Sequence, residues 1–328
     1  MRKAFLKIIG ISLLASLLFL PFHAQASDLD AQLTETTESY FYSPKPTDLD
    51  KIKSLLSKGA KATLPSNGSC GALIIAIQYK DPELVDLFLN AKADVKTSVN
   101  GTTGLTPLLI ALINIRDAKA LDSEKRIIKS LIKAGSDLSA KATEGIFPLK
   151  IAATGGTSGY PQPEIVDLLL KAGADINEKT YHGETALTSI AAGDLTTLKM
   201  LLAAGADPDT ETQKSYTPLH YVCKRPSDLK GKPEKDAAER IKLLMKSADS
   251  LNTPPKDDPM GVGVPLLEAL KSNNPDCVRA MIDAGAKLNA LAFSEDSQLS
   301  TNSRGWTVRQ TAKKHMELID PETAELLK

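Results

Sequence analysis

The sequence is poor in the residues that most often carry catalysis and metal binding. Its 328 residues include four histidines, three cysteines and one tryptophan, and aromatic residues make up only 5%. No His-Glu-x-x-His motif is present, and no closely spaced cysteines lie beside a histidine. Such spacings are what a zinc site requires. We therefore expect no enzyme, no metal site and no cofactor.

A long hydrophobic run is also lacking outside the N-terminus. Residues 8–22 are almost wholly apolar, but this stretch is shorter than the approximately 20 residues that span a bilayer. Three basic residues precede it, and Ala24-Gln25-Ala26 follows it as a small-x-small cleavage site. The pattern predicts a signal peptide over residues 1–26, cleaved before Ser27. We expect a periplasmic protein, or alternatively a secreted one, with no stable membrane insertion after cleavage.

The chain has no excess of charge of one sign. It contains 40 basic and 40 acidic residues, and removal of residues 1–26 takes away three basic residues and no acidic one. The remaining charge of about minus three gives no general attraction to nucleic acid or to an anionic membrane.

The three cysteines, Cys70, Cys223 and Cys277, are separated by 153 and 54 residues. An odd number so widely scattered does not form a disulfide framework. Their apolar or small-residue surroundings favour buried free thiols. A Cys223–Cys277 disulfide remains the alternative, because an exported protein meets an oxidising compartment.

The sequence repeats a unit with a recognisable beginning and end. The beginnings read Thr-Pro-Leu or a close variant, as at residues 106–108, 147–149, 185–187, 217–219 and 264–266. The endings combine paired apolar residues with Gly-Ala-Asp or a variant, as in Leu168–Asn177 and Leu201–Asp207. Their glycine positions fall at residues 59, 92, 135, 173, 205, 247 and 285, where Lys92 and Ser247 replace glycine. Self-similarity of this kind indicates a stack of repeated units.

Each residue type has a physical reason for its place in the unit. Threonine caps a helix through its hydroxyl, and proline at the first helical position gives up an amide that would lack a partner. Apolar residues such as Ile165, Leu168 and Leu169 form one helical stripe. Glycine then ends the helix in a left-handed conformation.

This unit resembles the ankyrin repeat, over about residues 47–328. The resemblance implies an all-α solenoid of stacked helix-turn-helix units with short β-hairpin loops. It gives about six full units between partial N- and C-terminal capping units. Residues 27–46 are acidic and lack a repeat opening, so we expect them to cap the stack with a partly disordered start. Asp48–Leu56 is expected to be the second helix of a truncated first unit, and residues 305–327 a partial last unit.

Several spacings exceed the family period of about 33 residues, which indicates insertions. Three of them fall between the two helices of a unit, at residues 116–124, 154–162 and 225–236. Two more fall between units, at residues 253–259 and 291–304. The first three are expected to form a ridge along one edge of the stack.

The resemblance implies that a protein partner is held in a concave groove formed by the first helices and the hairpin tips. The expected tip residues are Tyr181, His182, Glu184, Lys214 and Tyr216. The expected residues at the ends of first helices are Gln78, Tyr79, Asn114, Lys224, Arg225 and Lys271. Tyrosine and arginine are favoured at binding hot spots, and Lys224, Arg225 and Lys271 suggest an acidic partner surface. His220 fills the histidine position of the Thr-Pro-Leu-His opening, where the resemblance implies a structural role in the turn.

The sequence therefore predicts a non-catalytic, monomeric protein-protein interaction module whose partner it does not name. One version is an immunity or protective protein for a periplasmic toxin or enzyme. Another is an exported effector that binds a host protein.

Overall fold

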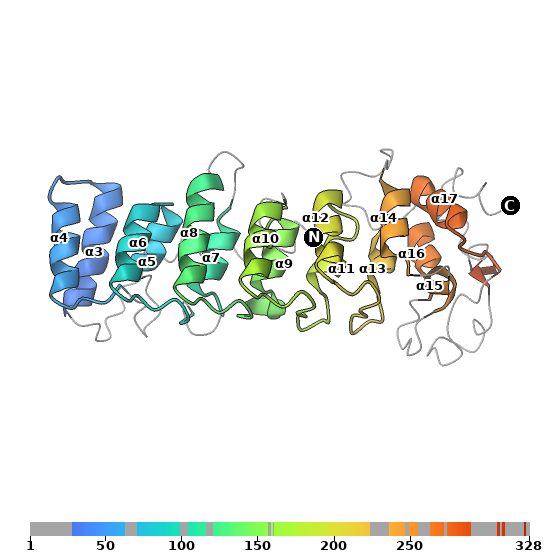
Figure 1. Ribbon diagram of the computed structural model, residues 1–328, viewed down its shortest axis with the longest axis horizontal. Helices are drawn as coiled ribbons and strands as arrows, with labels where there is room; N and C mark the ends of the chain where they lie inside the picture. Colours follow the sequence, from blue (N-terminus) through green and yellow to red (C-terminus); the bar gives the residue numbers. More distant parts are fainter. Residues whose placement is uncertain are drawn as a thin grey trace. The chain divides into compact units, whose positions relative to one another are not determined.

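The computed structural model describes residues 28–62, 71–98, 104–115, 121–156, 159, 161–223, 236–246, 249–254, 263–271 and 274–289, with residues 307, 308, 310, 311 and 325. These residues form helices joined by turns and loops (Figure 1). Among them, β-structure is limited to isolated bridge residues at Leu105 and Thr307. None of the helices in these ranges is long and apolar enough to cross a membrane. The chain divides into two compact units, residues 1–175 and 176–328.

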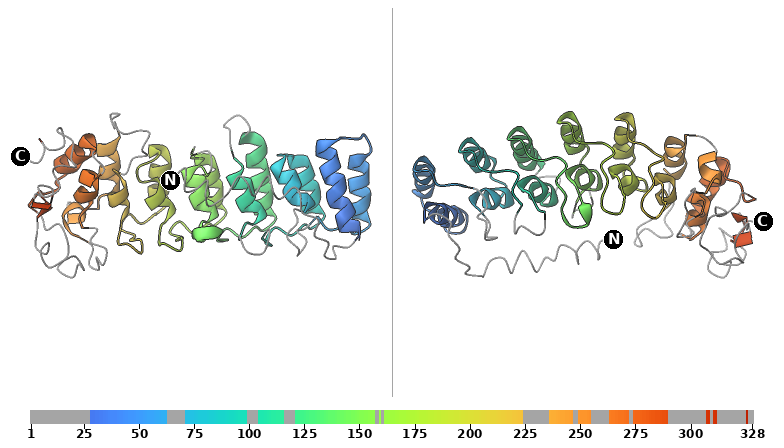
Figure 2. Two further views of the ribbon diagram at one scale, coloured as in Figure 1. Left: turned by 180° about the vertical axis from the view of Figure 1, so that it is seen from behind. Right: turned by 90° about the horizontal axis from the view of Figure 1, so that it is seen from below.

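The first unit is a stack of four helix pairs in two layers (Figure 2). The first helices of the pairs pack on one another in chain order, and so do the second helices from the second pair onward. The pairs are α3 (Asp28–Tyr42) with α4 (Asp48–Ser57), α5 (Ala72–Gln78) with α6 (Pro82–Asn90), α7 (Pro107–Ile113) with α8 (Leu121–Lys133), and α9 (Pro148–Thr154) with α10 (Pro163–Lys171). A single 3-10 turn, η2 (Thr143–Gly145), precedes α9.

The second unit repeats this arrangement with three helix pairs. They are α11 (Ala186–Ile190) with α12 (Leu195–Ala203), α13 (Pro218–Tyr221) with α14 (Ala237–Leu244), and α16 (Pro265–Lys271) with α17 (Pro275–Asp283). A short helix, α15 (Asp249–Asn252), packs on α16. In both units the apolar stripes of neighbouring helices face one another and form a continuous core, which is the architecture expected from the repeats.

The repeat openings start helices in the expected way. The Thr106 hydroxyl accepts a hydrogen bond from the Leu109 amide at 3.4 Å, and Pro107 is the first residue of α7. At the start of α11, Thr185 and Thr188 form a reciprocal capping box with hydrogen bonds of 3.1 and 2.8 Å. These bonds satisfy amides that have no partner within the helix.

The glycine position ends helices through backbone conformation rather than through lack of space. Gly173 has a φ of 94°, and a Cβ placed there would meet no atom within 4 Å. The next amide, that of Ala174, donates to the Leu169 carbonyl at 3.0 Å and closes the last turn of α10. Lys92 adopts the same left-handed conformation, with a φ of 64°. The assignment of Lys92 to a degenerate glycine position is therefore confirmed.

The N-terminal segment differs from the sequence-based expectation of a truncated first repeat. Residues 28–42 form α3, a helix of 15 residues that packs on α4 and α5, so the first repeat has both of its helices. The buried face of α3 carries Leu33, Thr36 and Thr37. The two threonine hydroxyls donate to the Gln32 and Leu33 carbonyls at 2.6 and 2.8 Å, which lets polar side chains lie in the core.

The expectation of free thiols is wrong for two of the three cysteines. Cys223, which follows α13, forms a disulfide with Cys277 in α17, with a Cα–Cα distance of 5.8 Å. Both side chains are buried. The sequence separation of 54 residues joins one repeat to the next, and Cys70 lies outside the described residues.

Most of the expected insertions lie outside the described residues: 116–120, 225–235, 255–259 and 291–304. Residues 121–124 belong to the first turn of α8. The ridge that the three insertions between paired helices were expected to form, and most of the partial last unit, therefore stay predictions.

Candidate functional site

Two hairpin tips of the second unit bring five of the predicted binding residues together. In the first tip the Thr180 amide donates to the Glu184 carbonyl at 2.9 Å, and in the second the Thr212 amide donates to the Tyr216 carbonyl at 3.0 Å. The Gln213 amide donates to the His182 carbonyl at 2.9 Å and joins the two tips. We call the surface formed by Tyr181, His182, Glu184, Lys214 and Tyr216 the tip surface.

Gly183 allows the two tips to lie this close. Its φ is 79°, and a Cβ at this position would lie 2.9 Å from the Gln213 nitrogen and 3.0 Å from the Thr212 Cα. Real Cβ atoms do not approach a backbone this closely, so a larger residue would force the tips apart. The backbone beneath the tip surface is thus held by hydrogen bonds and close packing.

The five side chains of the tip surface differ in how far they are available for contact. The Tyr181 residue is 59% exposed, and His182 and Lys214 are also exposed. Glu184 and Tyr216 are half-buried, and the Tyr216 ring lies with its centroid 5.6 Å from that of His220 and 5.4 Å from that of Tyr221. Tyr216 therefore supports the tip from within, whereas Tyr181 projects from it.

His220 has a structural role, as its place in the repeat opening predicts. Its Nδ1 accepts a hydrogen bond from the Thr217 amide at 3.0 Å, and its Nε2 lies 2.9 Å from the Gly263 carbonyl oxygen. This pairing assigns the ring proton to Nε2, which donates to Gly263. The side chain is buried, and it fastens the opening of one repeat to the opening of the next.

The predicted residues at the ends of first helices are only partly described. Gln78 ends α5, Tyr79 follows it, and Asn114 follows α7; Gln78 and Asn114 are half-buried. Lys271 ends α16, but its side chain is outside the described part of the structure. Lys224 and Arg225 are outside it altogether, so the basic patch stays a prediction.

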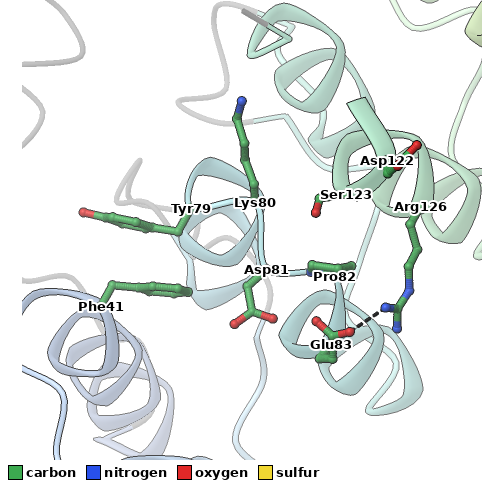
Figure 3. A pocket seen from close by; sticks show the side chains of 9 residues that line it. All are labelled: Phe41, Tyr79, Lys80, Asp81, Pro82, Glu83, Asp122, Ser123 and Arg126. Atoms are coloured by element: carbon green, nitrogen blue, oxygen red, sulfur yellow. Dashed lines mark hydrogen bonds and ion pairs between the residues drawn. The ribbon is translucent and has the colours of Figure 1, made fainter. Parts of the chain in front are cut away.

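Tyr79 belongs to a cluster of aromatic rings in the first unit that sequence reasoning missed (Figure 3). Its ring stacks on Phe41 at the end of α3, with centroids 4.3 Å apart and ring planes within 9° of parallel. Tyr42 meets Tyr79 edge-on at 5.5 Å. Tyr42 and Tyr79 remain 61% and 40% exposed. We call Phe41, Tyr42 and Tyr79 the aromatic edge.

A hollow of about 490 Å³ lies beside the aromatic edge. The ends of α3 and α5 and the beginnings of α6 and α8 surround it (Figure 3). Its lining residues are Phe41, Tyr79, Lys80, Asp81, Pro82, Glu83, Asp122, Ser123 and Arg126.

The hollow is electrostatically negative. Lys80 forms an ion pair with the buried Glu124, and Arg126 forms ion pairs with Glu83 and Asp86. The hydrogen bond from Arg126 holds the pKa of Glu83 below its usual range. Burial, followed by the hydrogen bond with Tyr42 and the nearby charges of Tyr42 and Glu38, raises the pKa of Tyr79 to about 12.

The family model for ankyrin repeats (three copies) matches two overlapping segments of the chain, residues 118–212 and 188–292. Together these segments cover more than half of the 328 residues. The chain belongs to the ankyrin-repeat family. No curated protein matches it.

Ankyrin repeats form protein-protein interaction modules, and members of the family are typically non-catalytic. The tip surface and the hollow of this ankyrin-repeat protein are suited to binding another protein surface. Within the described ranges, no three His, Cys, Asp or Glu side chains gather in a group that could hold a metal ion. The tip surface and the hollow offer exposed aromatic rings and charges instead, which are groups suited to recognition of another surface.

Part of the aromatic edge could have been found in the sequence of this ankyrin-repeat protein. Leu33, Thr36, Thr37, Tyr40 and Phe41 follow a spacing of three and four residues, which is typical of one helical face. Two of the five are threonines, so the face does not stand out as apolar. The stack with Tyr79 depends on a contact across 38 residues that no local pattern predicts.

Proposed function

We propose that this ankyrin-repeat protein is exported and binds one protein partner through its tip surface and the concave face of its first helices. The single observation that carries the proposal is Tyr181, which is 59% exposed on a tip whose backbone is fixed by hydrogen bonds. An exposed tyrosine on a rigid support loses little conformational entropy on binding. Tyrosine is also enriched among residues that dominate binding energy.

Two further features support export. Residues 1–26 have the sequence pattern of a signal peptide. The Cys223–Cys277 disulfide joins two buried cysteines, and disulfides persist mainly in oxidising compartments. The periplasm is our leading proposal for the location, and secretion is the alternative.

The partner's role separates two versions of this function. In one, the protein protects the cell by blocking a periplasmic toxin or enzyme; in the other, it is an effector that binds a host protein. Fractionation of the native cells distinguishes them. Retention in the periplasmic extract supports the protective version, and accumulation in the culture medium or in host cells supports the effector.

A pull-down from the native compartment tests the binding surface. The bait is the mature protein from Ser27, compared with Tyr181→Ala and with Lys171→Ala. Both variants shorten one exposed side chain, but Lys171 lies outside the tip surface and outside the aromatic edge. We expect one protein to be captured by the wild type and by Lys171→Ala and to be lost with Tyr181→Ala. Equal capture by all three forms would refute a role for the tip surface.

A further inference from the structure

The aromatic edge is an unusual exposure of ring surface in this chain. With seven tyrosines, seven phenylalanines and one tryptophan in 328 residues, aromatic side chains are scarce. Nevertheless Tyr40, Phe41, Tyr42 and Tyr79 gather at one place, and two of them are among the most exposed large apolar residues that the structure describes. Rings collected at a surface beside a hollow are typical of interaction sites.

The hollow is large enough for a short segment of another chain. Its volume of about 490 Å³ lies within the approximately 300–1,000 Å³ of common ligand pockets. Figure 3 shows the Phe41 and Tyr79 rings on one side and Arg126 on the other, with Asp81 and Pro82 between them. A ring wall, a proline and carboxylates thus border the same space.

The charges of the lining determine which kind of group fits there. Both lining cations are already paired: Lys80 with Glu124, and Arg126 with Glu83 and Asp86. The lining also contains the carboxylates of Asp81 and Asp122. The lining therefore holds three carboxylates and two cations, and an incoming cation meets a net negative field.

Asp81 is held in place by the fold. Its Oδ1 accepts the Leu84 amide at 2.9 Å as the N-cap of α6. The negative field reaches the neighbouring rings, because burial and then the charge of Asp81 raise the pKa of Tyr40 above its ordinary value. The fold thus fixes a carboxylate close to the aromatic edge.

We propose that this hollow binds a basic segment of a partner protein, with an arginine or lysine side chain lying between the aromatic edge and Asp81. The aliphatic stem of such a side chain packs against Tyr79 and Pro82, and its charged end lies near the carboxylate of Asp81. Cations are also attracted to the faces of aromatic rings. An acidic or purely apolar segment would leave this negative field uncompensated. The inference rests on the proposed role as a binding module, and it assigns a second contact that is separate from the tip surface.

The experiment measures binding of a fluorescein-labelled peptide of glycine, serine and three arginines to the mature protein, by fluorescence anisotropy at low salt. A peptide with glutamine and one with glutamate at the arginine positions are the reference ligands. We expect the wild type to bind the arginine peptide about tenfold more tightly than the glutamine peptide. Equal binding of the two peptides would overturn the proposal.

Matched variants locate the binding. Asp81→Asn removes the charge but keeps an oxygen that can cap α6. Asp194→Asn makes the same change at the N-cap of α12, where Asp194 accepts the Thr197 amide at 2.7 Å. We expect Asp81→Asn to weaken binding of the arginine peptide about three- to tenfold and Asp194→Asn to leave it unchanged. Equal weakening by both variants would mean general attraction to a negative protein and would contradict the site.

A further variant, Tyr79→Leu, tests the contribution of the ring. It should weaken binding of the arginine peptide, and if this variant does not fold, the two asparagine variants decide. The peptide assay is independent of the Tyr181 pull-down. Loss of the peptide preference therefore refutes this site alone, and loss of tip-dependent capture refutes the proposed function.

Discussion

The two units of the chain hold their repeats together differently. In the first unit α5, α7 and α9 each have seven residues. Charged side chains link neighbouring second helices in both units, as Arg126 on α8 does with Glu83 and Asp86 on α6, and as Lys199 on α12 does with Glu239 on α14. In the second unit α11 and α13 have only five and four residues. There the Cys223–Cys277 disulfide and the hydrogen bond from His220 to Gly263 tie the repeats together.

The difference follows from how a repeat stack gains stability. Each repeat is stabilised chiefly by the interface with its neighbour, and shorter first helices bury less apolar surface there. Specific links between repeats, namely the disulfide and the hydrogen bond from His220, compensate for this smaller buried surface. Asn252 adds another, since its side chain donates to the Gly285 carbonyl at 3.0 Å and accepts the Lys287 amide at 2.7 Å.

The largest effect should come from breaking the disulfide. Closing a loop of 54 residues restricts the unfolded chain and is worth about 4 kcal/mol in a chain-entropy model. Reduction should therefore destabilise the second unit and leave the first nearly unchanged. Hydrogen exchange of the oxidised and reduced mature protein, followed by mass spectrometry, measures both units in one sample.

The Cys223→Ala/Cys277→Ala double variant should match the reduced protein, and Cys70→Ala is the control for loss of a thiol. Segments 237–244 and 275–283 should lose protection, whereas segments 107–113 and 148–154 should keep it. Equal loss in both units would show that the stability of the whole chain depends on this one link.

The next effect concerns the hydrogen bonds of His220. Its replacement by alanine removes the acceptor for the Thr217 amide and the donor for the Gly263 carbonyl, two groups of the second unit. We expect His220→Ala to lower the free energy of unfolding by about 2–3 kcal/mol. Urea unfolding monitored by circular dichroism measures this. His182→Ala, at an exposed position, should change stability by less than about 0.5 kcal/mol.

The contrast between these units could be read from the sequence only in part. Helix starts and ends were predictable because Thr-Pro-Leu and the left-handed glycine position act within a few residues of chain. Even Lys92 could be assigned, since the neighbouring Ala91 and Ala93 keep the repeat ending recognisable. Local rules of this kind are enough to give the family and the helix pairs.

Contacts between repeats were not predictable in the same way. A spacing of 54 residues does not give the distance between Cys223 and Cys277. Only the packing of α13 on α16 and of α14 on α17 brings the two residues to a Cα–Cα distance of 5.8 Å. Likewise, α3 lacks the repeat opening and buries two threonines, so its pairing with α4 and the stack of Phe41 on Tyr79 were missed.

A smaller effect on stability is expected from substitutions at the glycine position that ends the second helix of a repeat, and it should have opposite signs in the two units. Lys92 in the first unit adopts a left-handed conformation that costs a residue with a side chain roughly 1 kcal/mol, so Lys92→Gly should stabilise by about 0.5–1 kcal/mol. Gly205 in the second unit has a φ of 92° and space for a Cβ, so Gly205→Ala should destabilise by about 1 kcal/mol. Thermal unfolding of the two variants measures both values. A loss of stability in Lys92→Gly would show that its side chain contributes more than the backbone conformation costs.

The smallest effect is a difference in pH dependence between the units. Burial, with the charge of Glu35, raises the pKa of Glu38 in the first unit above 4.5, so its ionisation opposes folding at neutral pH and this cost disappears as pH falls through the raised pKa to 4.5. The hydrogen bond from Lys246 lowers the pKa of Asp207 in the second unit below 3.8, so its contribution is present above pH 3.8 and is lost as pH falls through the lowered pKa.

Glu38→Gln and Asp207→Asn separate these two contributions. Glu38→Gln should be slightly more stable than the wild type at pH 7, and this advantage should vanish near pH 4. Asp207→Asn should be slightly less stable at pH 7, and its deficit should disappear only as pH falls from 3.8 through the lowered pKa, because the wild-type carboxylate of the folded protein becomes neutral only there. Urea unfolding at several pH values measures both differences. A Glu38→Gln advantage that does not change with pH would mean that packing, and not charge, distinguishes glutamine from glutamate at this position.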